Sequence, residues 1–126
     1  MSKILLVEDN KLSQKMMFYT LRHLGLDADM ADDGEEAVDK ASQEDYDLIL
    51  MDIQMPGYDG YEATRLIRSA EEGRGARRSF IVGLTGNVYD GEREKCIKAG
   101  MDDFLPKPFD VELFTELVRD RKVLDI

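Results

Sequence analysis

Cysteine, tryptophan and positive charge are scarce in this chain of 126 residues. Its single cysteine, Cys96, cannot form a disulfide within the chain, so we expect a reducing environment such as the cytoplasm. Lys and Arg number 17 against 27 Asp and Glu, which gives a net charge of -10. This balance disfavours direct binding to nucleic acid or to an anionic membrane surface, because both require clustered positive charge.

Long hydrophobic runs are also absent, which excludes a membrane-spanning helix. The first expected strand begins at Lys3, which leaves no room for a signal peptide. Apolar residues nevertheless make up 43% of the chain, enough to form the core of a globular protein. The length is typical of one domain, and no internal repeat or low-complexity tract is found. We therefore expect residues 1–126 to form one soluble domain.

Apolar runs and turn residues predict five strands that alternate with five helices. The strands are expected at 3–7, 27–31, 46–52, 80–85 and 103–106, and the second is polar enough for a position near an edge. The helices are expected after Asn10, from about Gly34 to Ser42, after Asp59, from about Asp90 to Ala99, and after Asp110. The charged, Gly-containing segment AEEGRGARRS (70–79) is expected to be a loop.

Helical spacing predicts which side chains face the core. These are Leu12, Met16, Met17, Leu21 and Leu24 in the first helix, and Val111, Leu113, Phe114, Leu117 and Val118 in the last. Asn10, Asp59 and Asp110 are the expected helix N-caps. His23 lies near a helix C-terminus, where the helix dipole accounts for it, and Cys96 is expected to be a small, partly buried apolar group.

Strands alternating with helices predict an α/β fold whose mainly parallel sheet is covered on both faces. Such sheets bind ligands outside the carboxyl ends of their strands. Polar groups stand at four of these ends: Glu8 and Asp9 after the first strand, Asp52 at the end of the third, Thr85 at the end of the fourth, and Lys107 after the fifth. If the strands are neighbours, these groups converge at one edge of the sheet.

Asp52 ends a run, Leu48 to Met51, that is apolar enough to be buried on both faces. Ionising a carboxylate there is costly unless something compensates it, and Glu8 and Asp9 would add repulsion and raise at least one pKa. A divalent cation removes the repulsion. Mg2+ fits best because it needs few carboxylates, keeps several waters and accepts phosphoryl oxygens. The backbone carbonyl of Gln54 is a further expected ligand.

A carboxylate beside Mg2+, a lysine and a hydroxyl is equipped to accept a phosphoryl group. Asp52 can attack phosphorus in line and form an acyl phosphate. Mg2+ and Lys107 would neutralise charge on the transferring group, and Thr85 would donate a hydrogen bond to a phosphoryl oxygen.

The motifs LLVEDN, LILMDIQMPGYDG, IVGLTGN and AGMDDFLPKPF occur in this order along the chain. Together they resemble the receiver domains of two-component response regulators. The resemblance implies a flavodoxin-like (βα)5 fold with strand order 2-1-3-4-5. It implies that Asp52 is the phosphoacceptor, that Glu8, Asp9, Asp52 and the Gln54 carbonyl form the Mg2+ site, and that Lys107 contacts the phosphate. It also implies that Thr85 and Phe104 are the switch residues and that the Lys107–Pro108 peptide is cis.

The segment GEREKCIKAGMDDFLPKP is most similar to receivers of hybrid sensor kinases, which implies a phosphorelay. The implied partner is a histidine kinase or a histidine phosphotransfer domain, and Mn2+ could replace Mg2+. The chain would then be no classical enzyme, but a switch that catalyses its own phosphorylation and slow dephosphorylation. Gln54 and Asn87 flank the site at positions that tune dephosphorylation in relatives. A stand-alone regulator and a domain of a larger protein both remain open, as does the oligomeric state.

Three other functions compete with this one. An aspartyl-phosphate phosphatase would need a second acid two residues after its nucleophile, and Gln54 cannot act as that acid and base. A flavodoxin-like cofactor binder would need a phosphate-binding loop after its first strand, where Glu8 and Asp9 instead present negative charge. A receiver-like scaffold that takes no phosphate would not need the complete set of groups found here.

Overall fold

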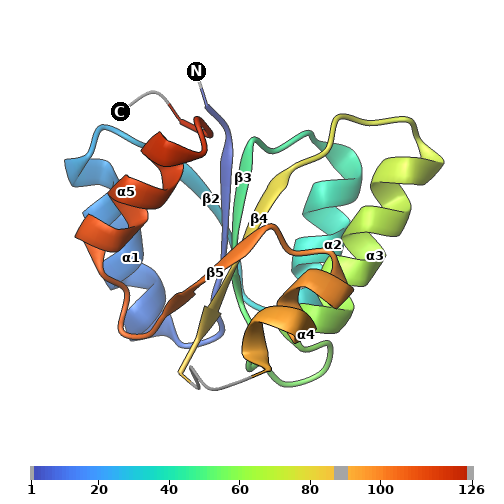
Figure 1. The fold of residues 1–126 in the computed structure, drawn as a ribbon, viewed down its shortest axis with the longest axis horizontal. Helices are drawn as coiled ribbons and strands as arrows, with labels where there is room; N and C mark the ends of the chain where they lie inside the picture. The colour runs from blue at the N-terminus through green and yellow to red at the C-terminus, as the bar shows by residue number, and fades with distance from the viewer. Residues whose placement is uncertain (1, 87–90, 125–126) are drawn as a thin grey trace.

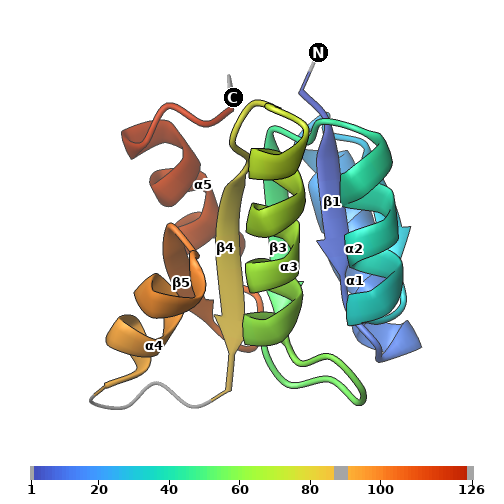
Figure 2. The same ribbon diagram turned by 90° about the vertical axis from the view of Figure 1, so that its right-hand side faces the viewer.

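The computed structural model describes residues 2–86 and 91–124, which form a twisted parallel sheet between two layers of helices (Figures 1 and 2). The strands are β1 Ile4–Val7, β2 Ala28–Ala31, β3 Leu48–Asp52, β4 Phe80–Thr85 and β5 Asp103–Pro106. The helices are α1 Lys11–His23, α2 Gly34–Gln43, α3 Gly60–Gly73, α4 Glu92–Ala99 and α5 Val111–Asp120. The predicted alternation of strands and helices is therefore confirmed.

The sheet has the order β2-β1-β3-β4-β5, and all its described pairings are parallel. This is the flavodoxin-like (βα)5 topology that the resemblance implied. β3 lies at the centre, with β1 and β4 on either side, and its last residue, Asp52, is in register with Leu84. Because the strands are parallel, the chain leaves all of them at one edge, and this edge carries the predicted site.

Each face of the sheet has its own hydrophobic core because side chains alternate along the strands. Leu48 and Leu50 of β3 share a core with residues of α1 and α5, whereas Ile49 and Met51 share one with residues of α2, α3 and α4. Figure 1 shows these two layers of helices on opposite faces of the sheet. All residues of β1 and β3 are buried, which explains why both strands read as continuous apolar runs. β2 lies at an edge and is partly exposed, as predicted.

The predicted helix N-caps are confirmed. A side-chain oxygen of Asn10 accepts a hydrogen bond from the backbone N–H of Ser13, that of Asp59 from Glu62, and that of Asp110 from Glu112. The predicted start of the fourth helix at Asp90 lies outside the described residues.

Two predicted core faces are partly wrong. Leu12 and Met16 of α1 are 69% and 62% exposed, so the prediction that both methionines of KMM are core holds only for Met17. Val111 and Leu113 of α5 are also exposed, while Phe114 and Val118 are buried. A helix lying on a sheet buries only one side. The buried side of α1 is formed by Gln14, Met17 and Leu21, spaced three and four residues apart.

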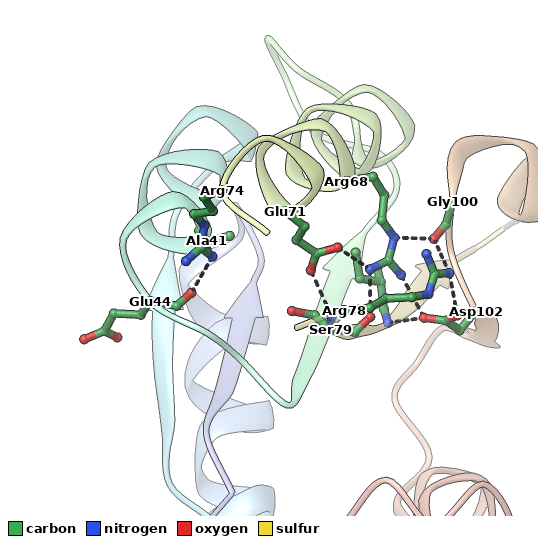
Figure 3. A network of polar contacts seen from close by, with 10 residues as sticks. Ala41, Glu44, Arg68, Glu71, Arg74, Arg78, Ser79, Gly100 and Asp102 are labelled. Carbon is green, nitrogen blue, oxygen red and sulfur yellow. Dashed lines mark hydrogen bonds and ion pairs between the residues drawn. The ribbon is translucent and has the colours of Figure 1, made fainter. Parts of the chain in front are cut away.

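The segment 70–79 is not wholly a loop, because α3 continues through its first four residues. A buried ionic network explains why charged residues extend this helix (Figure 3). The guanidinium of Arg68 donates to Glu71 and to the carbonyl of Ser79, each at 2.8 Å. It also donates to the carbonyl of Gly100 and to Asp102, again at 2.8 Å. Arg68 thereby joins α3, the start of β4 and the turn between α4 and β5.

Removing Arg68 should destabilise the fold strongly, because Glu71 would lose its ion pair and Asp102 would keep only the exposed guanidinium of Arg78. We expect Arg68→Ala to lower the free energy of unfolding by about 3–5 kcal/mol. Arg77→Ala is the matched control, because Arg77 is 64% exposed in its ion pair with Asp47 and should cost less than about 1 kcal/mol. Urea denaturation measures both. Equal losses for the two variants would contradict the role given to Arg68.

Cys96 is buried in α4, as predicted, at 1% exposure. Burial raises the pKa of its thiol to about 11, and the Glu92 carboxylate contributes to the rise.

In the described residues, no helix is long and apolar enough to cross a membrane.

The raised pKa should protect Cys96 from alkylation in the folded protein. Near pH 8 only about one thousandth of the thiol would be ionised, and thiolate is the reactive form. We expect iodoacetamide to label the unfolded chain in urea rapidly and the native chain hardly at all, as followed by intact mass. Native labelling at the rate of free glutathione would show that the thiol is accessible.

Candidate functional site

Three carboxylates meet at the carboxyl edge of the sheet, as the sequence predicts. Glu8 and Asp9 follow β1, and Asp52 ends the neighbouring β3. Each offers an oxygen that lies within 4.8 Å of the others, a grouping that could hold a metal ion. Glu8 and Asp52 are buried and Asp9 is exposed, so the cluster opens to solvent on the Asp9 side.

Lys107 follows β5, the edge strand of the sheet, and its side chain reaches the cluster past the end of β4. Its Nζ lies 2.6 Å from Asp52 Oδ1 and 3.8 Å from Glu8 Oε1. Its backbone N–H donates to the carbonyl of Thr85 at 2.8 Å, which holds the lysine over the end of β4. The Lys107–Pro108 peptide is cis, which confirms the expectation from the resemblance.

The two oxygens of Asp52 have different environments. Oδ1 accepts from Lys107 and from the backbone N–H of Gln54, at 3.2 Å. Oδ2 is buried and accepts a hydrogen bond from no described residue. A buried carboxylate oxygen without a donor is unfavourable and suits direct ligation to a cation. The three-carboxylate donor set has the hard oxygen chemistry of Mg2+, so the residues present fit that ion.

Glu8 is the acid of the cluster whose pKa is clearly shifted. Burial, together with the neighbouring Asp52 carboxylate, raises the pKa of its carboxyl to about 7. The backbone N–H of Asn10, 3.2 Å from Oε2, and the charge of Lys107 oppose the rise. Without a cation, Glu8 is therefore partly protonated near neutral pH, which relieves the repulsion among the three acids.

The remaining predicted residues surround the cluster. Thr85 is buried at the end of β4, one position beyond the residue in register with Asp52. Phe104 of β5 is half-buried and packs on the core beneath α2, α3 and α4. Gln54 is exposed and lines a cleft of about 520 Å3, which Thr85 also lines. Asn87 lies outside the described residues.

The corner after β3 fixes where Asp52 stands. The backbone N–H of Gly60, the first residue of α3, donates to the carbonyl of Ile53 at 2.8 Å and closes the loop that carries Gln54. A Cβ on Gly60 would lie 2.5 Å from the Asp52 carbonyl oxygen and 2.6 Å from the Cα of Ile53. Both are backbone atoms that cannot turn aside, so only glycine lets α3 pack this closely against the strand end.

Sequence reasoning missed three polar residues near the site. Gln14 of α1 bonds to the backbone of Glu8, and Tyr61 of α3 donates to the buried Glu92 of α4 beside the cleft. Gln14 could have been found, because it continues the helical spacing of the buried Met17 and Leu21. No local pattern marks Tyr61 or Glu92 as partners, because they lie 31 residues apart in the sequence.

Comparison with known families agrees with this geometry. Residues 4–119 match the response regulator receiver domain. The match covers most of the chain and includes both strand ends that carry the three acids, as well as Lys107. The chain therefore belongs to the response regulator receiver domain family.

Its curated relatives include hybrid histidine kinases of Dictyostelium discoideum. Hybrid signal transduction histidine kinase F is 41% identical over 118 residues, and kinase G is 45% identical over 112 residues. These matches cover 93% and 87% of this chain but only 11% and 3% of the two kinases. The chain thus spans a small part of the relatives that it matches.

Two solved structures are especially informative. The receiver domain of the sensor histidine kinase PA1611 from Pseudomonas aeruginosa, with magnesium coordinated in its active site cleft, is 47% identical with a TM-score of 0.80. The match covers 94% of this chain and 95% of that domain. The Saccharomyces cerevisiae Ssk1 receiver domain, crystallised with the histidine phosphotransfer protein Ypd1, is 28% identical with a TM-score of 0.88, covering 98% and 92%.

Enlarging Gly60 should disturb the strand end that carries Asp52. We expect Gly60→Ala to lower the free energy of unfolding by about 1–3 kcal/mol, because the added methyl group meets backbone. Gly73→Ala is a control at the other end of α3, where a Cβ would meet nothing within 4 Å. It should be neutral or stabilise the helix by up to about 1 kcal/mol. Thermal or urea unfolding measures both, and a neutral Gly60→Ala would show that the corner yields.

Proposed function

We propose that residues 1–126 form one receiver domain that works as a phosphorylation switch in a phosphorelay. Asp52 takes a phosphoryl group from the phosphohistidine of a histidine kinase or a histidine phosphotransfer domain. The observation that carries this proposal is the buried Asp52 carboxylate, with Lys107 at 2.6 Å and an oxygen that no described residue satisfies. Family membership supports a phosphohistidine donor. The structurally similar Ssk1 receiver domain, crystallised with the histidine phosphotransfer protein Ypd1, supports the same donor.

In the transfer, an oxygen of Asp52 forms a bond to phosphorus while the P–N bond of the donor imidazole breaks. The electron pair of that bond stays on the imidazole nitrogen, which then takes a proton. Burial of Asp52 at the end of a rigid strand holds the nucleophile in place, and its exposed neighbour Asp9 marks the side from which the donor approaches. Lys107 provides a fixed positive charge for the phosphoryl oxygens.

Glu8, Asp9, Asp52 and the backbone carbonyl of Gln54 would hold Mg2+. When bound, the ion neutralises charge on the phosphoryl oxygens and on the three acids. The magnesium-containing PA1611 receiver supports this assignment. Mn2+ has the same preference for oxygen ligands and could replace Mg2+.

The product is an acyl phosphate whose extra charge must be met by the surrounding residues. Thr85 and Lys107 would contact the phosphoryl group, and Phe104 would respond to a movement of Thr85. The rearrangement would change the surface of α4, β5 and α5 and so its affinity for a downstream partner. Gln54 supplies no acid or base for water attack, so we expect self-dephosphorylation to be slow. We expect the domain to act in the cytoplasm, where its single thiol stays reduced.

Phosphorylation by a small donor tests this function directly. Metal-free protein is incubated with radiolabelled acetyl phosphate, with and without Mg2+. We expect Mg2+-dependent labelling that alkali removes, as it does for an acyl phosphate. Asp52→Asn should abolish the label because the amide cannot attack phosphorus.

Asp47→Asn is the matched control, because it changes the same functional group next to the other end of β3. It should take up label as the wild type does. Label that persists in Asp52→Asn, or that is lost equally in both variants, would overturn the assignment of Asp52.

A further inference from the structure

Gln14 is an unusual residue for the inner side of a helix that packs on a sheet. It is 5% exposed, and its buried neighbours on α1 are the apolar Met17 and Leu21. Burying an amide is unfavourable unless its polar atoms find partners. The Nε2 group of Gln14 donates to the backbone carbonyl of Glu8 at 3.1 Å and to Asp32 Oδ1 at 2.9 Å. Both amide hydrogens are therefore used.

The bond to Glu8 fixes the turn that carries two of the three carboxylates. The N–H of Glu8 donates to the carbonyl of Ala31 at 3.1 Å, so the backbone of Glu8 is held on both sides. Its carbonyl belongs to the peptide unit that leads into Asp9. Because a peptide unit is planar, holding this carbonyl also fixes the direction in which Asp9 leaves the strand.

The bond to Asp32 anchors Gln14 to the next strand end. Asp32 lies in the turn between β2 and α2, and its Oδ1 also accepts from Lys11 Nζ at 2.7 Å. Gln14 thus connects the turn after β1 with the turn after β2. Neither Gln14 nor Asp32 belongs to the three-carboxylate group itself.

We propose that Gln14 is a positioning residue for the divalent cation. It holds the Glu8–Asp9 peptide so that both carboxylates face the site before the ion arrives. This inference rests on the proposed function only in that a cation binds there. Groups that orient metal ligands from behind commonly change metal affinity by tenfold or more, so we expect an effect of about tenfold.

Calorimetric titration of Mg2+ into metal-free protein tests the inference without any phosphoryl transfer. Gln14→Met keeps the length of the side chain but removes both hydrogen-bond donors. We expect its Kd for Mg2+ to rise about tenfold. Leu21→Ala, further along the buried side of the same helix, should lower stability but leave the Kd unchanged. An unchanged Kd in folded Gln14→Met, or an equal rise in both variants, would overturn the proposal.

Changes at Asp32 give a second test on an exposed residue, where folding is not at risk. Asp32→Asn removes the charge but keeps an oxygen that can accept from Gln14, whereas Asp32→Ala removes both. We expect Asp32→Ala to raise the Kd for Mg2+ more than Asp32→Asn does. Equal values for the two variants would count against the positioning role, because only charge would then matter.

Phosphorylation by acetyl phosphate at increasing Mg2+ adds a kinetic readout. In Gln14→Met, the Mg2+ concentration at half-maximal rate should rise about tenfold, while the rate at saturating Mg2+ approaches that of the wild type. A purely structural defect would lower the maximal rate instead. The two proposals fail in distinguishable ways. Wild type without Mg2+ binding refutes the metal site and the positioning role together, whereas equal binding by wild type and Gln14→Met refutes only the positioning role.

Discussion

A negative charge at the end of a fully buried strand is the constraint around which this molecule is arranged. Asp52 cannot be ionised there without compensation, and the parallel topology determines where compensation comes from. Glu8 and Asp9 stand beside it because β1 pairs with β3, and Lys107 reaches it because β4 separates β3 from β5 by one strand width. Three segments distant in sequence therefore meet at one sheet edge, and none of them would form this site alone.

Negative charge exceeds positive charge at this edge of the sheet. One lysine faces three carboxylates, and burial together with the neighbouring Asp52 carboxylate raises the pKa of Glu8 to about 7. A divalent cation would offset this deficit of positive charge. Because positive charge is scarce at this edge, Lys107 is the cation that contacts Asp52 Oδ1 among the described residues. Asp52 Oδ2 accepts a hydrogen bond from no described donor. A site with balanced charges would make the fold more stable but would attract a divalent cation less strongly.

Much of the fold could be predicted from the sequence, because its signals are local. The apolar run of β4 gave its bounds without error, and Asn10, Asp59 and Asp110 cap helices as expected. The errors arose where tertiary contacts decide. Leu12 and Met16 have helical spacing, yet the sheet packs on another side of α1. Glu71 looked like a loop residue because its partner Arg68 can only be recognised as buried in three dimensions.

The glycine at position 60 limits how the start of α3 can move relative to the end of β3. The start of α3 is pressed against the backbone of Asp52 and Ile53, so this corner is not a hinge although it contains the residue most often associated with hinges. Under the proposed function, motion that follows phosphorylation of Asp52 would then pass through the other side of this residue, along β4 and β5. In that case the β3 side of the sheet would keep the phosphoacceptor in place, and the β4 and β5 side would transmit the conformational change.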